Sequence, residues 1–190
     1  MLFRSRLALD LSPEENHERF LEGTGSIVID QLHKTAYYAI SERTDASLAK
    51  EWCERTGSKP VTFSATDRQL RPIYHTNVVM HIGNGFSVLA TETIRDPEEA
   101  IRVKSELTGS GRALIELDMK QVESFAGNGL QLMNENGEFV YVLSKRGWEA
   151  LREDQQAVIR NHTRVITPDL PTIETLGGGS ARCMLAELFG

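Results

Sequence analysis

A pattern of predicted strands and helices recurs about every 53 residues along this chain and limits the folds that it can adopt. In each unit two β-rich runs joined by a turn precede a helical run, and a third β-rich run closes the unit. Complete units are expected at residues 26–66, 77–118 and 129–168, and a fourth is expected to begin at Ala181–Phe189. A unit of this kind cannot bury its sheet alone, so the units are predicted to pack against one another.

The first unit shows the signals most clearly. The runs Ser26–Gln31 and Thr35–Ile40 are predicted to form a hairpin, and Lys59–Ala65 is predicted as the third strand. Between them, Asp45–Thr56 is typical of a helix that places Leu48, Trp52 and Cys53 on one face, and Gly57 is its stop signal.

The other two units repeat this order. Asp96 is expected as a helix N-cap, and Gly83-Asn84-Gly85 as a tight turn. The predicted elements of the second unit are strands Asn77–Ile82, Phe86–Ile94 and Arg112–Asp118 and helix Pro97–Thr108. Those of the third are strands Gly129–Met133, Glu138–Ser144 and Arg164–Thr167 and a helix over about Gly147–Asn161. The fold class is therefore α/β, built from repeated strand-strand-helix-strand units.

Four polar residues occupy one register of the repeat. Glu22, His75 and Asn128 directly precede the first strands of their units, and Cys183 lies at the start of the fourth, with spacings of 53, 53 and 55 residues. In a radial repeat, equivalent positions of successive units face the same axis. We therefore expect these four side chains to converge at the mouth of one central cavity.

Cys183 follows Gly177-Gly178-Gly179-Ser180, whose glycines allow a close approach of the backbone to a ligand. Its thiolate is a candidate nucleophile, whereas the alternative is a small buried core residue. His75 is a candidate proton shuttle or else a turn histidine. Glu22 is a candidate ligand of cationic nitrogens or else an exposed loop charge. Cys53, beside Trp52, is expected in the core.

Composition narrows the function classes. A net charge of −6 without clustered Lys and Arg argues against a nucleic-acid partner, and no apolar run is long enough to span a bilayer. The two cysteines form no disulfide framework, which favours a reduced, cytoplasmic setting, and no Cys or His spacing suggests a metal site.

The motifs FLEGTGS (20–26), SERT (41–44), PIYHTN (72–77), FAGN (125–128) and GGGSARCMLAE (177–187) resemble the citrulline-utilisation hydrolases, often labelled amidinotransferases. These are related to arginine deiminase and dimethylarginine dimethylaminohydrolase. The resemblance implies the pentein fold, a five-unit α/β propeller with its active site on the axis. It covers nearly the whole chain, which is expected to be one domain, 1–190, the C-terminal part of a pentein catalytic domain.

The resemblance also implies roles. Cys183 would be the nucleophile, His75 the general acid and then general base, and Glu22 the carboxylate that contacts His75 and substrate nitrogens. Arg43 would hold the α-carboxylate of an amino-acid substrate, for which its forked guanidinium is suited. The family uses no metal and no organic cofactor. Citrulline, converted to ornithine, ammonia and carbon dioxide, is the first expected substrate, with arginine deiminase or amidinotransferase activity as the alternative.

The chain departs from the family in size, because it holds three units and the start of a fourth where the family fold has five. The open propeller would expose an apolar edge. A second hypothesis, from another class, is therefore an inactive truncated fragment that only binds a partner. Assembly with a further copy of the chain stays open.

Overall fold

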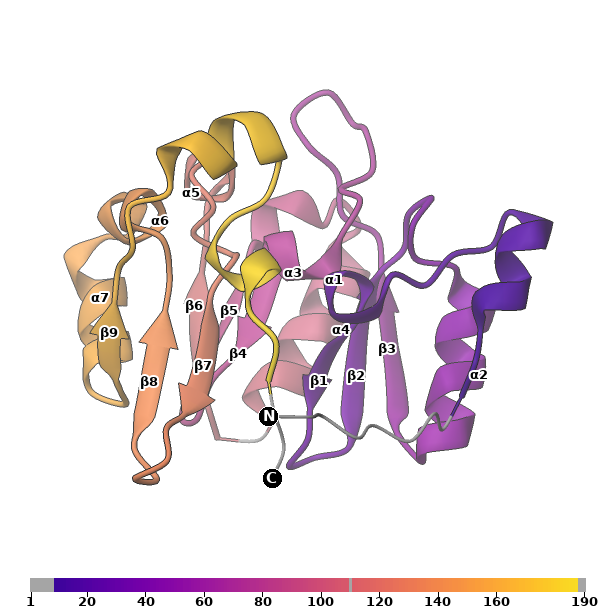
Figure 1. Cartoon of the computed structure of the whole chain (residues 1–190), viewed down its shortest axis with the longest axis horizontal. Coiled ribbons are helices and arrows are strands. Elements are labelled where there is room, and N and C mark those ends of the chain that lie inside the picture. Colours follow the sequence, from indigo (N-terminus) through magenta and orange to yellow (C-terminus); the bar gives the residue numbers. More distant parts are fainter. Residues whose placement is uncertain (1–8, 110, 188–190) are drawn as a thin grey trace.

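The computed structural model describes residues 9–109 and 111–187, and these fold into three mixed three-stranded sheets. Figure 1 shows the sheets side by side, with the first at the right and the third at the left. In every sheet the first two strands are antiparallel and the second and third are parallel. The strands are β1 (Val28–Asp30), β2 (Thr35–Ala39) and β3 (Lys59–Phe63); β4 (Met80–Ile82), β5 (Phe86–Leu89) and β6 (Ala113–Glu116); and β7 (Leu130–Met133), β8 (Phe139–Val142) and β9 (Arg164–Ile166).

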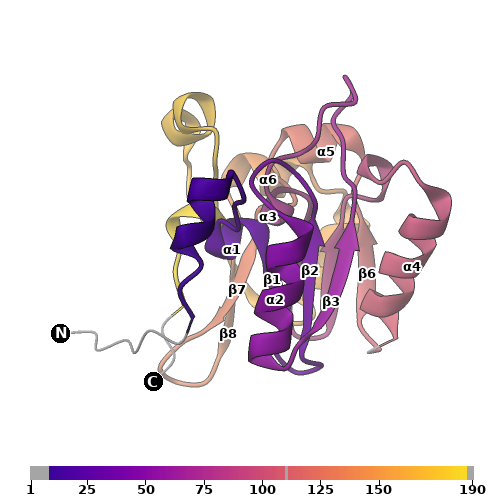
Figure 2. The same ribbon diagram turned by 90° about the vertical axis from the view of Figure 1, so that its right-hand side faces the viewer.

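The helices fall into two groups. Those that connect the parallel strands of each sheet are α2 (Ala46–Thr56), α4 (Pro97–Thr108), and the pair α6 (Lys145–Ala150) and α7 (Glu153–Arg160). Shorter turns are α1 (Gly23–Ser26), α3 (Thr76–Val79), α5 (Met119–Glu123), 3-10 turns at Ser12–His17, Thr91–Thr93 and Ala181–Met184, and a π-helical turn at Ile173–Gly177. The segment that contains residues 173–184 lies on one side of the sheets and α4 on the other (Figure 2).

Local chemistry explains the helix limits. The Asp45 carboxylate accepts hydrogen bonds from the amides of Ser47 and Leu48, which satisfies the first turn of α2. Gly57 ends that helix with a φ of 68°, a conformation that glycine adopts without strain. Asp96 caps α4 in the same way through the amide of Glu98. The predicted cap and stop signals are confirmed.

One hydrophobic core joins the three units. A continuous cluster of buried side chains runs from Val28 in β1 to Ile159 in α7. The first strands of all three sheets also line one open hollow of about 550 Å³, together with residues of the 182–187 segment. The α/β fold of small mixed sheets and the repeated order of elements are therefore as predicted.

Several sequence predictions were wrong in detail. The strand expected over Phe86–Ile94 ends at Leu89, and Thr91–Thr93 form a 3-10 turn. Residues 77–79 are helical, because the Met80 amide donates to the carbonyl of Thr76 and closes a helical turn, so the strand begins at Met80. The long helix expected over Gly147–Asn161 divides in two, because Leu151 takes an extended conformation and is buried.

A further error concerns the fourth unit expected at Ala181–Phe189. Residues 181–184 form a 3-10 turn closed by the Leu185 amide on the carbonyl of Arg182, and no strand forms within residues 181–187. Phe189 lies outside the described residues. In the part of the chain that the structure describes, no helix has the length and apolar character needed to cross a membrane.

Candidate active site

The four residues of the common register lie at, in or near short turns of the chain. Glu22 and His75 are the N-cap residues of α1 and α3, Asn128 lies shortly before β7, and Cys183 is within the 3-10 turn Ala181–Met184. The repeat thus places Glu22 and His75 at the same point of their units.

Hydrogen bonds tie these turns to one another. The Thr76 hydroxyl donates to the carbonyl of Ser26 at 2.6 Å, and the Asn77 amide group donates to the carbonyl of Thr24 at 3.2 Å. The Asn128 amide group in turn donates to the carbonyl of Asn77 at 3.0 Å. A continuous network therefore links the turns of the first, second and third units.

His75 and Glu22 form a direct pair, with 2.7 Å between Nε2 and Oε2. Gly25 makes room for the imidazole, because a Cβ on this residue would lie 2.7 Å from the ring. Nη1 of Arg43 lies 3.6 Å from the same Glu22 oxygen, and its guanidinium stacks over the ring of Tyr74 at 5.2 Å. An imidazole, a carboxylate and a guanidinium are thus gathered at one point.

The thiol of Cys183 is exposed and contacts the buried side chain of Asn128. Sγ lies 3.4 Å from Nδ2 and 3.6 Å from Oδ1 of the amide. The preceding glycine run allows this placement, since Gly178 has a φ of 67° and a Cβ on Gly179 would lie 3.2 Å from Sγ.

Tyr74 connects the two halves of the site. Its ring centroid lies 4.9 Å from that of His75, and its hydroxyl donates to the carbonyl of Gly178 in the glycine run before Cys183. Burial raises the pKa of Tyr74, and the negative charge of a nearby Cys183 thiolate raises it further, whereas Arg43 opposes the rise. The structure therefore brings all four residues of the register, and Arg43, to one region.

Sequence reasoning missed two residues of this site, Tyr74 and Asn77. Both belong to the PIYHTN motif, so their position beside His75 was the available signal. It also treated Asn128 only as a register position, without a contact. The expectation for Cys53 is confirmed: it is 1% exposed, beside the Tyr38 hydroxyl, and burial raises the pKa of its thiol.

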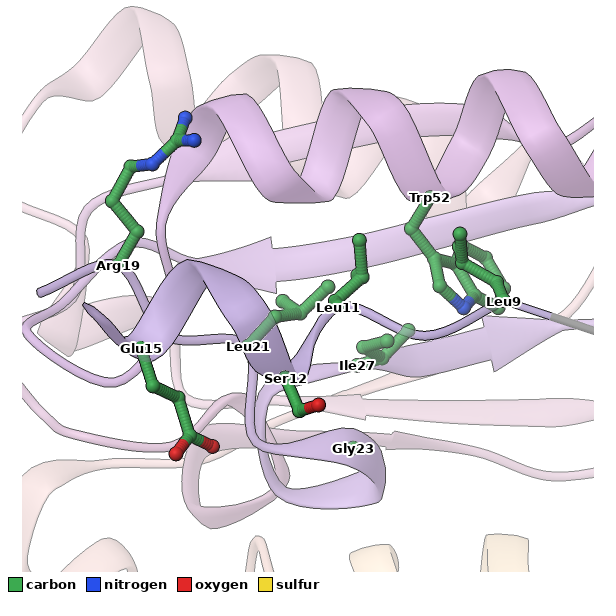
Figure 3. A pocket seen from close by; sticks show the side chains of 9 residues that line it. All are labelled: Leu9, Leu11, Ser12, Glu15, Arg19, Leu21, Gly23, Ile27 and Trp52. Carbon is green, nitrogen blue, oxygen red and sulfur yellow. The ribbon is translucent and has the colours of Figure 1, made fainter. Parts of the chain in front are cut away.

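Two hollows adjoin the site. The larger one, described above, reaches Thr24 and Arg182, the neighbours of the first and fourth register positions. A smaller one of about 300 Å³ flanks Glu22 laterally, beside Leu21 and Gly23, and Figure 3 shows Trp52 and Ile27 among its lining side chains. Within residues 9–109 and 111–187, no three His, Cys, Asp or Glu side chains gather as a metal site would require.

Three mixed sheets line a common hollow, and a thiol, an imidazole–carboxylate pair and a guanidinium lie in the turns beside these sheets. The model of the eukaryotic N,N dimethylarginine dimethylhydrolase family matches residues 2–190, and the chain belongs to this family. The relation to guanidino-modifying enzymes expected from the motifs is thereby confirmed. No match was found among curated protein sequences.

Solved structures show the same fold at low sequence identity. ArgZ, an arginine dihydrolase of the ornithine-ammonia cycle in cyanobacteria, aligns with a TM-score of 0.66 and 13% identity over 86% of this chain and 24% of ArgZ. AgrE in complex with ornithine and NAD+ aligns with a TM-score of 0.68 and 15% identity over 86% of this chain and 22% of AgrE.

A dimethylarginine dimethylaminohydrolase, solved as an adduct with 4-chloro-2-hydroxymethylpyridine, aligns with a TM-score of 0.53 and 14% identity. That alignment covers 86% of this chain and 58% of the enzyme. The chain therefore spans about a quarter of the ArgZ and AgrE chains and little more than half of this one.

Proposed function

We propose that the chain carries the site of a cysteine-dependent hydrolase that acts on the guanidino or ureido carbon of an amino acid. The observation that carries the proposal is the 2.7 Å pair between His75 and Glu22, tied through Tyr74 and the Asn77–Asn128 contact to the exposed thiol of Cys183. A nucleophile, a proton carrier and a group that orients the carrier are the parts that covalent catalysis needs.

The reaction proceeds in two steps. The Cys183 thiolate attacks the central carbon and forms a C–S bond, the C–N bond to the departing nitrogen breaks, and His75 donates the proton that this nitrogen needs. His75 then takes a proton from water, the water oxygen bonds to the same carbon, and the C–S bond breaks to return the thiolate. Glu22 stabilises the imidazolium and accepts hydrogen bonds from substrate N–H groups.

The contact between Arg43 and Glu22 bears on the substrate. Glu22 already meets one guanidinium, 3.6 Å away, and a substrate guanidinium would form the same charge-assisted contact. The neutral ureido group of citrulline would gain hydrogen bonds without the ion pair. We therefore place arginine or an N,N-dimethylated arginine first, in line with the family, and retain citrulline, which the motifs favoured, as the alternative.

Arg43 has a second task in this proposal. Once a substrate guanidinium binds Glu22, the Arg43 side chain is released toward the substrate α-carboxylate, while its stacking on Tyr74 keeps it at the site. The loss of Arg43 should then weaken substrate binding more than it slows the chemical step.

We propose further that the three sheets are units of the pentein propeller, whose remaining units complete the wall of the 550 Å³ hollow. The supporting observation is that the first strands of all three sheets line that hollow. A chain that keeps the site and only binds a partner remains the alternative of another class.

Product analysis with N,N-dimethylarginine, arginine and citrulline tests the activity. We expect citrulline from either guanidino substrate, loss of turnover in Cys183→Ala and His75→Ala, and retained turnover in the matched control Cys53→Ala. Binding of a substrate by Cys183→Ala without turnover by the native chain would favour the partner-dependent alternative. Absence of both binding and turnover for all three substrates would refute the proposal.

A further inference from the structure

We propose that Asn128 is a positioning residue whose side-chain amide donates a hydrogen bond to the thiolate of Cys183 and thereby holds the sulfur in its charged form. The inference rests on the proposed function only in taking Cys183 as the nucleophile. It assigns a task to the one residue of the common register to which the family resemblance gave none.

The orientation of the Asn128 amide is fixed by its neighbours. Nδ2 lies 3.0 Å from the backbone carbonyl of Asn77, which can only accept, so the nitrogen and not the oxygen must face it. An amide nitrogen carries two hydrogens. Asn77 offers the Asn128 nitrogen two acceptors, its backbone carbonyl at 3.0 Å and its Oδ1 at 3.4 Å, and Sγ of Cys183 lies at 3.4 Å as the third. With one hydrogen directed to the nearer Asn77 carbonyl, the second can be donated to Sγ.

The thiol and the thiolate of Cys183 interact differently with the Asn128 amide. A neutral thiol can donate to Oδ1, which lies 3.6 Å from Sγ, but such a bond is weak. A thiolate can only accept, and an N–H bond to a charged acceptor is roughly twice as strong as a neutral one. Asn128 is 1% exposed, so water does not compete for its amide. The amide therefore favours the thiolate.

The backbone holds Asn128 in place before any ligand arrives. The backbone amide of Asn128 donates to the carbonyl of Phe125 at 2.9 Å. Its backbone carbonyl accepts from the backbone amide of Arg182, next to Cys183, at 3.4 Å. The preceding residue must be glycine, because a Cβ on Gly127 would lie 2.1 Å from the carbonyl oxygen of Val78. No rearrangement is needed for the amide to meet the sulfur.

The pH dependence of alkylation by iodoacetamide tests this directly and requires no substrate. In a Cys53→Ser background, the rate of Cys183 modification should rise with pH to a plateau. Asn128→Asp keeps the shape but replaces the donor with a carboxylate, and Asn128→Ala removes the amide. Both variants should raise the pH at which the alkylation rate of Cys183 is half its maximum by about one unit or more. Below that pH, alkylation should then be about tenfold slower.

The alkylation rate of Cys183 at high pH, where it reaches its plateau, distinguishes this role from a merely structural one. If the amide acts on the charge of sulfur, the fully ionised thiolate of Asn128→Asp should react as fast as that of the native protein. The matched control Asn134→Ala, in the turn between β7 and β8, should leave midpoint and plateau unchanged. A lower plateau with an unmoved midpoint, or an unmoved profile in both variants, would overturn the proposal.

A measurement on the native residue covers the case in which the variants fail to fold. The proposal requires the alkylation midpoint of Cys183 to lie below about 8.5, the ordinary pKa of a cysteine. A midpoint at or above that value would overturn it. Catalytic turnover is read separately, so a shifted alkylation profile without turnover would leave this inference standing and remove the proposed function.

Discussion

Cys53 and Cys183 carry the same side chain in opposite surroundings. Cys53 lies on the inner face of α2, where burial raises the pKa of its thiol and the Tyr38 hydroxyl lies 3.2 Å from Sγ. Cys183 lies exposed behind three glycines and beside an amide donor. Reactivity of a cysteine depends on access and on the thiolate fraction. Burial limits access to Cys53, and its raised pKa lowers its thiolate fraction.

Selective alkylation should follow from this contrast. In the folded protein at neutral pH, iodoacetamide should modify Cys183 at least about tenfold faster than Cys53, as read by peptide mass spectrometry. His75→Ala should slow modification of Cys183 if imidazolium near the site stabilises the thiolate, and His162→Ala serves as the control. Equal labelling of both cysteines, unchanged by His75→Ala, would show that no catalytic site is assembled.

At the scale of elements, an ion pair joins the first two sheets. Asp30 at the end of β1 and Arg112 just before β6 are 3% and 9% exposed, and the guanidinium meets both carboxylate oxygens at 2.6 and 2.9 Å. Burial alone would raise the pKa of Asp30, but hydrogen bonds from Arg112 and His33 outweigh it and lower the pKa. The stabilisation is therefore present above the ordinary pKa of aspartate and is lost as pH falls through the lowered value.

Removal of the Arg112 cation from this pair should destabilise the folded protein. Arg112→Met should lower the free energy of unfolding by about 3 kcal/mol at neutral pH, because it leaves the buried Asp30 carboxylate without its cation and with the remaining contacts to His33. Lys104→Met, which breaks the exposed pair of Lys104 with Glu116, should cost less than about 1 kcal/mol. Urea unfolding of both variants checks this, and equal small losses would contradict it.

A buried histidine joins the second and third sheets. His81 in β4 is fully buried, its Nδ1 donates to the carbonyl of Gly127 at 2.8 Å, and Nε2 accepts from the Tyr141 hydroxyl in β8 at 2.9 Å. Burial lowers the pKa of His81 to about 3, and the charge of Arg182 acts in the same direction. The folded protein therefore holds His81 neutral where the unfolded chain would be protonated.

This difference in pKa between the folded and unfolded states makes the stability of the protein depend on pH. Between the unfolded pKa of about 6.5 and the folded value, the unfolded state binds the extra proton, so stability should fall by about 1.4 kcal/mol per unit of decreasing pH. His81→Phe should be less stable at pH 7 yet lose less on acidification, whereas exposed His17→Gln should retain the native slope. Urea midpoints between pH 7 and 4 measure this, and a native slope in His81→Phe would rule it out.

At the scale of the whole molecule, the three units share one core that extends from Val28 to Ile159. Trp52 on α2 belongs to the first unit and Trp148 on α6 to the third. A continuous core predicts cooperative unfolding in place of the independent melting of separate repeats.

Single-tryptophan variants can test this cooperativity. In Trp148→Phe, fluorescence reports on Trp52 and the first unit; in Trp52→Phe, it reports on Trp148 and the third. Within each variant, the urea midpoint by fluorescence should coincide with that by far-ultraviolet circular dichroism. A separation of the two midpoints in either variant would mean that the units unfold independently.

Sequence periodicity was sufficient to predict the order of elements in three units and the equivalent positions of Glu22 and His75, because strand and helix periods and capping residues such as Asp45 and Asp96 are local signals. It did not predict the turn that holds Cys183, where a fourth unit was expected. It misassigned residues 77–79, since the helical turn there depends on contacts with another unit, including that of Asn77 with Thr24.

The motifs predicted that His75 and Glu22 act together, but the contacts between individual atoms follow from the packing of the units. The pairing of Asn128 with the Cys183 sulfur, the place of Tyr74 between the two halves, and the contact of Arg43 with Glu22 all join residues from different segments of the chain. No periodicity within one segment encodes such contacts. They arise when the units pack, because the close approaches at Gly25 and Gly127 bring the turns together.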